Sequence, residues 1–231
     1  MRQRFRPTKV ESRPVLDLVD FGKRPCVILD IGANCGGFAG NILLRCPLAQ
    51  VHCFEPNPDV LPRLRENAAR YGTLNGSPRC HVRAVGVGSS TDKRELIVTG
   101  LRAASSFLAV ADAARTGWPD ADFEEQRRQL VSIVRIDEYL DQQEVASVKL
   151  MKLDVQGFER EALEGCGERL HNIEYIVSEV QFQRLYHSAP LWYEIVDYVR
   201  GFGFKPIVMD GFCFAPDGAP LQADILLQRT G

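Results

Sequence analysis

A glycine-rich bend near the start of the chain most strongly constrains how this sequence can fold. It has the sequence Asp30-Ile31-Gly32-Ala33-Asn34-Cys35-Gly36-Gly37, directly after the apolar run 27–31 and before a helical pattern over residues 36–45. Glycines at a strand-to-helix turn let the backbone bend tightly and approach a ligand, and free amides at the helix start face that ligand. The pattern predicts the first strand–turn–helix unit of a doubly wound α/β sheet.

Strand-like and helix-like segments alternate along the rest of the chain, which is typical of a mostly parallel sheet with helices on both faces. Further strands are predicted at residues 50–54, 81–87, 94–99, 131–135, 148–154, 175–180, 204–209 and 224–228. Further helices are predicted at residues 58–71, 136–140, 158–166 and 191–200. In the first of these helices, Asn57 is the expected N-cap and Pro58 the first helical residue.

Residues 101–130 interrupt this alternation. They contain a group of small residues, a turn at Gly117-Trp118-Pro119-Asp120, and a charged, helix-like run over residues 124–128. A long insertion in a compact domain is usually a lid or a binding segment. We therefore expect a basic N-terminal arm at residues 1–22 and a single domain at residues 23–231 with an insertion at about 101–130.

Composition and charge narrow the classes of function. With 231 residues, of which 45% are hydrophobic and 25% charged, the chain suits one α/β domain. Its net charge of −2 disfavours a broad nucleic-acid-binding face, and no apolar stretch approaches the ~20 residues that span a bilayer. The seven cysteines lack C-x-x-C spacing and are expected to be reduced thiols. These features predict a cytoplasmic protein without membrane or nucleic-acid partners, and a homo-oligomer is an open alternative.

Carboxylates end three of the predicted strands: Asp30, Glu55 and Asp154. In a doubly wound sheet the acid that ends the second strand reaches the ribose hydroxyls of an adenosine-containing ligand. Asp30 suits an ammonium or hydroxyl group of the ligand better than a pyrophosphate, which it would repel. Asn34 stands where the dinucleotide fingerprint requires glycine, which disfavours a nicotinamide-dependent dehydrogenase.

Several short motifs, in order along the chain, resemble the FkbM family of S-adenosylmethionine-dependent methyltransferases. They are Asp30–Gly36, Phe54–Pro56, Ala84–Gly86, Ser105–Ser106, Ile136–Leu140, Lys152–Glu159 and Asp224–Leu227. The match runs from about Cys26 to Gln228. The resemblance implies the seven-stranded, Rossmann-like methyltransferase sheet with a reversed last strand near residues 224–228. It also implies O-methylation of a sugar, a polyketide or a related metabolite.

The resemblance also implies a cofactor, S-adenosylmethionine, and a product, S-adenosylhomocysteine. Asp30, Gly32 and Gly36 would line the methionine end of the cofactor, and Glu55 would hold its ribose. The complete set of predicted cofactor-binding residues is Asp30, Gly32, Asn34, Gly36, Glu55 and, near the adenine, Val85, Gly86 and Ser89. One departure concerns Gln156, which stands where the family usually has an acid. This departure weakens any proposal that two acids hold a metal, so we assign no metal ligand, and metal dependence is open.

Methyl transfer from a sulfonium to a hydroxyl group needs an aligned acceptor and a base that removes its proton. The candidate bases are Asp154, His187 and Glu179, although Asp154 could simply cap the following turn and His187 could be a surface residue. Ser105, Ser106 and Gln181 are candidates for contact with a small-molecule or glycan acceptor. The alternatives are a cofactor-binding module without catalysis and a nucleic-acid or N-methyltransferase.

Overall fold

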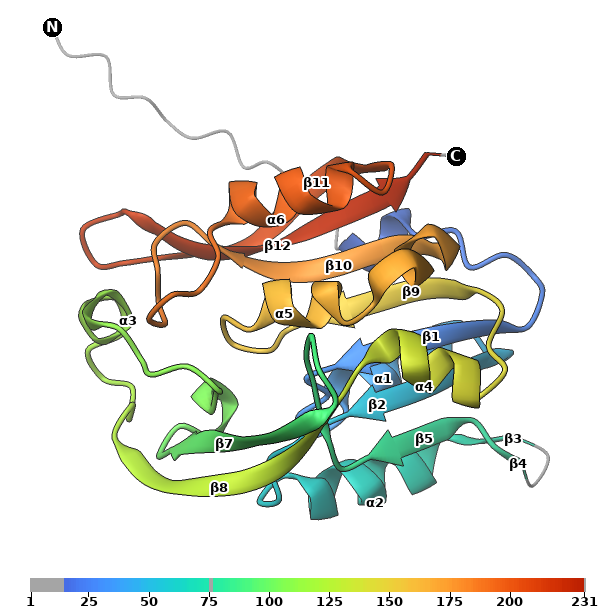
Figure 1. Cartoon of the computed structure of the whole chain (residues 1–231), viewed down its shortest axis with the longest axis horizontal. Coiled ribbons are helices and arrows are strands. Elements are labelled where there is room, and N and C mark those ends of the chain that lie inside the picture. Colours follow the sequence, from blue (N-terminus) through green and yellow to red (C-terminus); the bar gives the residue numbers. More distant parts are fainter. Residues whose placement is uncertain (1–14, 75–76, 231) are drawn as a thin grey trace, which may run out of the picture.

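The computed structural model describes residues 15–74 and 77–230 of the chain. The basic residues of the predicted N-terminal arm, at positions 2–13, lie outside the described residues. The described part begins with a short 3₁₀ helix, η1 (Val15–Leu18), which packs against the large sheet. Figure 1 shows this sheet with helices on both faces and a smaller sheet beside it.

Seven strands form the large sheet, in the spatial order β11-β12-β10-β9-β1-β2-β5. Strands β5, β2, β1, β9 and β10 run parallel, whereas β12 is antiparallel to both of its neighbours. This arrangement confirms the predicted doubly wound sheet with a reversed last strand. The strands are β1 (Cys26–Ile31), β2 (Ala49–Phe54), β5 (Cys80–Arg83), β9 (Val148–Leu153), β10 (Ile173–Gln181), β11 (Phe204–Phe214) and β12 (Pro220–Arg229).

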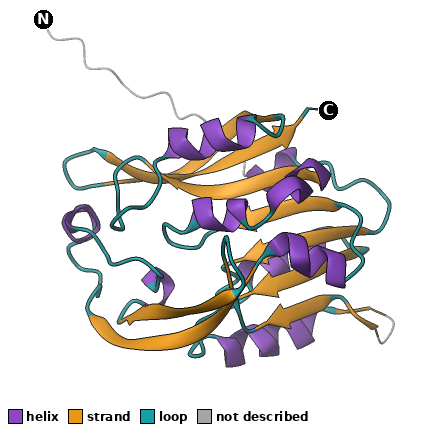
Figure 2. Cartoon of the chain, viewed as in Figure 1, coloured by secondary structure: helices purple, strands orange, loops and turns teal. Residues whose placement is uncertain are grey.

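Side-chain alternation along the central strands divides the core into two layers. In β1, Leu29 and Ile31 pack on one face with α4, α5, η3 and α6, whereas Ile28 packs on the other face with α1 and α2. Because successive side chains of a strand point to opposite faces, one apolar run supplies both layers. Figure 2 shows helices on both sides of the strands. The helices are α1 (Gly37–Arg45), α2 (Leu61–Tyr71), α4 (Ile136–Gln142), α5 (Glu159–Glu164), η3 (Gly167–Asn172) and α6 (Trp192–Arg200).

Three strands form the smaller sheet, in the order β6-β8-β7. They are β6 (Gly86–Val87), β7 (Asp92–Thr99) and β8 (Glu125–Val134). The predicted helix-like run over residues 124–128 is wrong, because residues 125–128 lie in β8 and pair with β7. One of these charged side chains forms an ion pair between the two strands: the Arg128 guanidinium of β8 lies 3.5 Å from the Glu95 carboxylate of β7. Pairing with a neighbouring strand therefore overrides the local helical pattern.

Residues 100–124, between β7 and β8, form a segment that we call the flap. It contains η2 (Arg102–Ala104) and α3 (Asp112–Gly117). The backbone N–H of Ala111 donates to the carbonyl of Leu185 at 2.9 Å, and apolar flap side chains pack against Leu185 and Leu221. The flap therefore rests on the connection between β10 and α6 and on the start of β12.

Several predicted boundaries differ from the structure: the last three predicted strands, for instance, are longer in the structure as β10, β11 and β12. Two differences bear on the site. Helix α2 begins at Leu61 rather than Pro58, because Asn57 Oδ1 accepts a hydrogen bond from the Asp59 N–H at 3.0 Å and caps a turn before the helix. The predicted strand over residues 81–87 is divided between β5, which pairs with β2, and β6, which pairs with β8. A short hairpin of β3 (Thr73–Leu74) and β4 (Ser77–Pro78) was not predicted.

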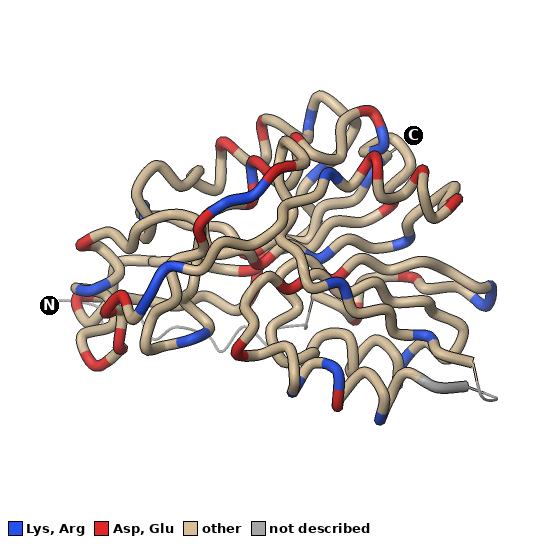
Figure 3. Tube along the Cα trace, turned by 60° about the horizontal axis from the view of Figure 1, so that its bottom comes forward, with Lys and Arg blue, Asp and Glu red and all other residues tan. Residues whose placement is uncertain are grey.

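Basic and acidic residues are interspersed along the trace in Figure 3. All seven cysteines lie in the described part of the chain and are free thiols, as predicted. Between residues 15 and 230, apart from the two that are not described, no helix combines the length and apolarity of a membrane span.

Candidate active site

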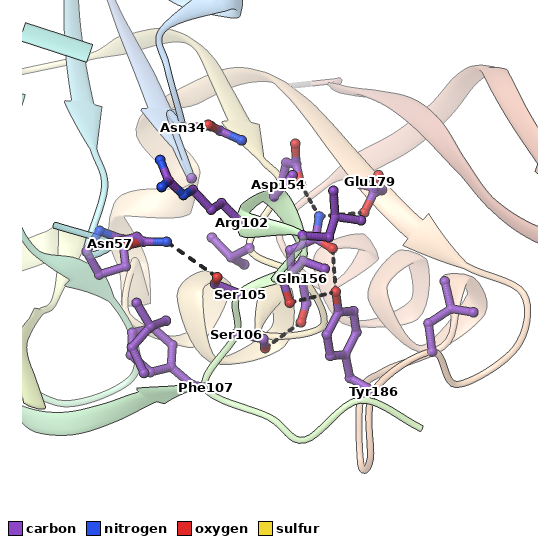
Figure 4. Close-up of a pocket in the computed structure, with 18 of the residues that line it drawn as sticks. Asn34, Asn57, Arg102, Ser105, Ser106, Phe107, Asp154, Gln156, Glu179 and Tyr186 are labelled. Atoms are coloured by element: carbon purple, nitrogen blue, oxygen red, sulfur yellow. Dashed lines mark hydrogen bonds between the residues drawn. The ribbon is translucent and has the colours of Figure 1, made fainter. Parts of the chain in front are cut away.

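A cavity of about 420 Å³ lies between the carboxyl edge of the large sheet and the flap. Its lining comes from the segments that follow β1, β2, β9 and β10, together with flap residues (Figure 4). Ligand sites of doubly wound sheets lie outside the carboxyl ends of the strands, and pockets of this size hold cofactors or small molecules. We call the segments that follow β1, β2 and β9 the floor of the cavity.

The β1–α1 turn forms one wall of the cavity through Gly32 and Asn34. The N–H groups of Gly32 and Ala33 both donate to the Phe54 carbonyl at 3.0 Å, which ties the turn to the end of β2. Gly32 has φ 78°, and a Cβ there would lie 1.8 Å from the Asp154 carbonyl oxygen. This close approach of two backbone segments requires glycine.

Not every glycine of the turn contacts the cavity. Gly36 has φ 83°, and a Cβ there would lie 2.8 Å from Leu64 of α2. Gly36 therefore allows α1 and α2 to pack closely at the start of α1, and it does not line the cavity.

Glu55 lines the cavity directly after β2 and is 7% exposed. Its Oε2 accepts a hydrogen bond from the Asn34 N–H and its Oε1 one from the Asn57 N–H, both at 2.8 Å. Burial raises the pKa of this carboxyl, and the two backbone donors oppose that shift. Each carboxylate oxygen has a second lone pair, so Glu55 can still accept hydrogen bonds from ligand hydroxyls.

Asp30 lies beneath the turn, is fully buried, and does not line the cavity. Its Oδ1 lies 3.4 Å from the Lys152 ammonium, which also donates to the Gly32 carbonyl at 2.6 Å and lies 3.3 Å from Asp154 Oδ2. Burial raises the pKa of Asp30, and Lys152 opposes that shift. Burial lowers the pKa of Lys152, but the neighbouring acids Asp154 and Asp30 outweigh this effect and raise it. Lys152 therefore ties Asp30, beneath the turn, to Asp154 in the floor.

A second cavity of about 300 Å³ shares Asp154 with the first. Lys152 lines it, as do Phe38 and Asn41 at the start of α1. Because basic side chains, Lys152 and Arg45, and acidic ones, Asp210 and Asp224, line this cavity together, it suits a zwitterionic group.

A network of polar side chains surrounds Asp154 at the edge of the main cavity (Figure 4). Gln156 Nε2 donates to Asp154 Oδ1 at 2.6 Å and to Glu179 Oε2 at 3.2 Å. Gln222 donates to the other oxygen of Glu179 at 2.6 Å, and the Tyr186 hydroxyl donates to Gln156 Oε1 at 2.7 Å. Burial raises the pKa of Glu179 well above its usual range, with further increases from nearby acids, Asp154 first among them. Gln156 therefore stands between two acids and donates to both of them.

The flap closes over this network through two serines. Ser106 Oγ donates to the Gln156 carbonyl at 2.7 Å, and Ser105 Oγ accepts from Asn57 Nδ2 at 3.3 Å. Arg102 also lines the cavity and is its only basic side chain among the described residues. The flap therefore contributes polar groups of a kind that could contact an acceptor.

The structure does not bring all the predicted site residues into the cavity. His187 is exposed, with its N–H donating to Ala109 of the flap, and Gln181 is buried and accepts from the Leu185 N–H at 2.9 Å. Neither residue lines the cavity, nor do Val85 and Ser89, whereas Gly86 does.

Three residues of the network, Gln156, Tyr186 and Gln222, were missed by sequence reasoning as site residues. Gln156 was visible in the sequence only as a departure from the family pattern, and Tyr186 only as a neighbour of His187. Gln156 could have been predicted as a hydrogen-bond donor, because it closely follows Asp154 and a second acid, Glu179, lies near the end of the next strand. Tyr186 gives no local signal, because its place depends on how the β10–α6 connection folds back over the sheet.

The family model of the methyltransferase FkbM domain matches residues 30–206. The chain belongs to the FkbM methyltransferase family. It is therefore an S-adenosylmethionine-dependent methyltransferase. The match covers the floor, the flap and the network around Asp154 except Gln222.

Curated relatives share about a quarter of the sequence. The 2-O-methyltransferase NoeI of Sinorhizobium fredii is 28% identical over 229 residues, which cover 94% of this chain and 84% of NoeI. The 31-O-demethyl-FK506 methyltransferase FkbM of Streptomyces tacrolimicus is 28% identical, over 82% of this chain and 76% of that protein. The hexuronic acid methyltransferase AglP of Haloferax volcanii is 25% identical, over 77% and 65%.

Solved structures share the fold. A methyltransferase FkbM from Methylobacillus flagellatus has a TM-score of 0.56 at 19% identity, and the match covers 90% of this chain and 45% of that longer one. The magnesium protoporphyrin IX methyltransferase ChlM from Synechocystis, with bound S-adenosylmethionine, has a TM-score of 0.52 at 11% identity, over 94% and 76%.

Proposed function

We propose that this methyltransferase transfers the methyl group to a hydroxyl oxygen of a sugar, a polyketide or a related metabolite, with Asp154 as the base. The observation that carries the proposal is the position of Asp154, at the junction of the two cavities and 38% exposed in its side chain. An alcohol is a poor nucleophile, so a carboxylate beside the reacting oxygen promotes the transfer. The names of the relatives NoeI, FkbM and AglP, a 2-O-methyltransferase, a 31-O-demethyl-FK506 methyltransferase and a hexuronic acid methyltransferase, support an acceptor of this class.

The residues present fit the cofactor. Glu55 has free lone pairs for ribose hydroxyls, Gly32 and Asn34 present the β1–α1 turn to the cavity, and Gly86, which also lines the cavity, would lie near the adenine. Lys152 and Asn41 in the second cavity suit the methionine end. When bound there, S-adenosylmethionine supplies an electrophilic methyl group on its sulfonium.

The remaining steps belong to the residues of this chain. The floor orients the reacting centre, because Glu55, Gly32 and Asp154 are tied to three neighbouring strands. Asp154 accepts the acceptor's proton as the oxygen–methyl bond forms, and the flap excludes water from the closed cavity. The Lys152 ammonium, 3.3 Å from Asp154 Oδ2, holds that carboxylate in position by an ion pair.

The experiment is incubation of the purified chain with S-adenosylmethionine carrying a ¹³C-labelled methyl group and a panel of sugars, uronic acids and polyketides. The expected result is an O-methyl resonance in at least one product, reduced at least about 100-fold in rate by Asp154→Asn. Asp20→Asn, on the surface before β1, serves as the matched control and should keep wild-type turnover. An N-methyl product, or full turnover in Asp154→Asn, would overturn the proposal.

A further inference from the structure

Gln156 has a strained backbone that aims its side chain into the acid cluster. Its φ is 56° and that of Gly157 is 94°, both in the left-handed region. Glu159 Oε1 accepts hydrogen bonds from the N–H groups of Val155 and Gly157, at 3.1 and 3.2 Å, and so holds this turn. A non-glycine residue persists in this conformation only when the surrounding structure fixes it.

The side chain of Gln156 satisfies three partners that no other residue type of its length could satisfy together. Two carboxylates, Asp154 and Glu179, need donors, and one hydroxyl, that of Tyr186, needs an acceptor. A primary amide has two N–H donors and one carbonyl acceptor. A glutamate would keep the acceptor for Tyr186 but would place a third carboxylate against the other two.

We propose that Gln156 is a positioning residue of the transfer reaction, whose amide cross-links Asp154, Glu179 and Tyr186 and so holds the Asp154 carboxylate in place as the base. The proposal rests on the proposed function, because it assigns a role relative to that base. The amide does here what a bound cation would do in a cluster of acids: it brings two carboxylates together without adding charge.

Gln156 also couples this network to the flap. Its backbone carbonyl accepts from Ser106 Oγ, while Tyr186, which donates to its side chain, lies 3.2 Å from the carbonyl of Ala104. Closure of the flap and orientation of the base therefore involve the same residue. We therefore expect the acceptor to enter while the flap is open. Asp154 reaches its final position only when the flap closes and these contacts form.

Several charged groups face the network and set its electrostatics. Lys152 contributes the positive charge next to Asp154, and Arg102 faces the cavity from the flap. The acids that contribute to the raised pKa of Glu179, in addition to Asp154, are Glu159 of α5 and Asp224 of β12. An extra negative charge at position 156 would add to this set and disfavour the ionised form of Asp154.

The test measures the titration of Asp154 directly and needs no acceptor. Protein labelled with ¹³C at the aspartate carboxyl groups is titrated by NMR, and Asp154→Asn identifies the Asp154 signal. In Gln156→Glu the midpoint should rise by about one pH unit or more, because a repelling carboxylate replaces a donor. In the double variant Gln156→Glu/Glu179→Gln the midpoint should return most of the way, because the amide of the new glutamine restores a donor beside the two acids.

A second single variant keeps the test valid if Gln156→Glu does not fold. Gln156→Met has a similar length, adds no charge and removes the donors, so the Asp154 midpoint should rise by a smaller amount. Equal midpoints in the wild type and in a folded Gln156 variant would overturn the proposal. So would a double variant whose midpoint stays at the Gln156→Glu value.

The functional readout separates the two proposals. With an active acceptor, Gln156→Glu should lower kcat at neutral pH and move the acid limb of the pH–rate profile upward by the shift seen in the titration. If the wild type methylates no hydroxyl acceptor, the proposed function fails, whatever the titration shows. If the wild type is active and the acid limb of Gln156→Glu does not move, only the role of Gln156 fails.

Discussion

The floor of the cavity and the flap above it are held by different kinds of contact. In the floor, backbone meets backbone: Asp154 donates its N–H to the Ile31 carbonyl at 3.1 Å, and Gly32 has no room for a Cβ. Where the flap meets the floor, the contacts are made by side chains, such as Ser106 to the Gln156 carbonyl. Side-chain contacts can break one at a time, whereas close-packed backbone moves only as a unit. Backbone hydrogen bonds from Ala111 to Leu185 and from His187 to Ala109 fix the flap to the β10–α6 connection, so we infer a rigid floor for the cofactor and a flap that opens only where it covers the floor.

The largest expected effect tests the rigidity of the floor. Gly32→Ala should lower the free energy of unfolding by at least about 3 kcal/mol, because it adds a backbone collision to the strain of a positive φ. Urea unfolding measures it. Gly22→Ala is the matched control, since Gly22 has φ 63° but nothing within 4 Å of a Cβ, and it should cost only about 1–2 kcal/mol. Equal losses in both variants would show that the floor has room to relax.

The next effect concerns Glu159, whose carboxylate accepts the backbone hydrogen bonds that hold the turn at Gln156. Burial raises the pKa of Glu159 to about 7, although neighbouring backbone N–H groups oppose the shift. The folded-state pKa of Glu159 lies above the ordinary value of 4.5. Its contribution to the free energy of unfolding is therefore fully present below pH 4.5 and is lost as the pH rises through 7. The loss amounts to at most about 3 kcal/mol. Glu159→Gln should therefore flatten the decrease in unfolding free energy between pH 4.5 and 7, measured by urea unfolding.

The surface variant Glu168→Gln controls for the change of charge, since the Glu168 side chain is 90% exposed. Parallel stability curves for the wild type and Glu159→Gln would contradict the assigned role of Glu159.

A third prediction separates floor from flap by cofactor affinity. Glu55→Gln should weaken binding of S-adenosylhomocysteine by about 10- to 100-fold, the loss expected for charged hydrogen bonds. Ser105→Ala, on the flap, should change the dissociation constant by no more than about threefold. Isothermal titration calorimetry measures both. Similar losses in the two variants would remove the distinction between a cofactor-binding floor and an acceptor-binding flap.

The smallest effect should appear in the flap. Ser106→Ala removes the hydrogen bond to the Gln156 carbonyl and the one that Ser106 Oγ accepts from the Leu108 N–H at 3.0 Å. The cost should be about 1 kcal/mol, seen as faster hydrogen exchange of the flap amides near residue 106. Unchanged exchange there would mean that other contacts keep the flap closed.

The same contrast explains what the sequence could and could not predict. The floor could be predicted from local signals, because Gly32 and Glu55 directly follow apolar strands. The alternation of strands and helices then predicts that both residues lie at the carboxyl edge of one parallel sheet. The smaller sheet that carries the flap depends on pairing between distant segments, which is why the charged residues around Arg128 were predicted as helix and lie in β8. Asp30 has the expected strand-end position, but the direction of its side chain depends on Lys152, which comes from a strand far along the chain.

The most direct test of the account is a crystal structure of the chain with S-adenosylhomocysteine. We expect the ligand in the cavity above the β1–α1 turn, with its ribose hydroxyls within hydrogen-bond distance of Glu55 and its sulfur facing Asp154. A ligand bound elsewhere, or bound in this cavity without contact to Glu55, would contradict the account.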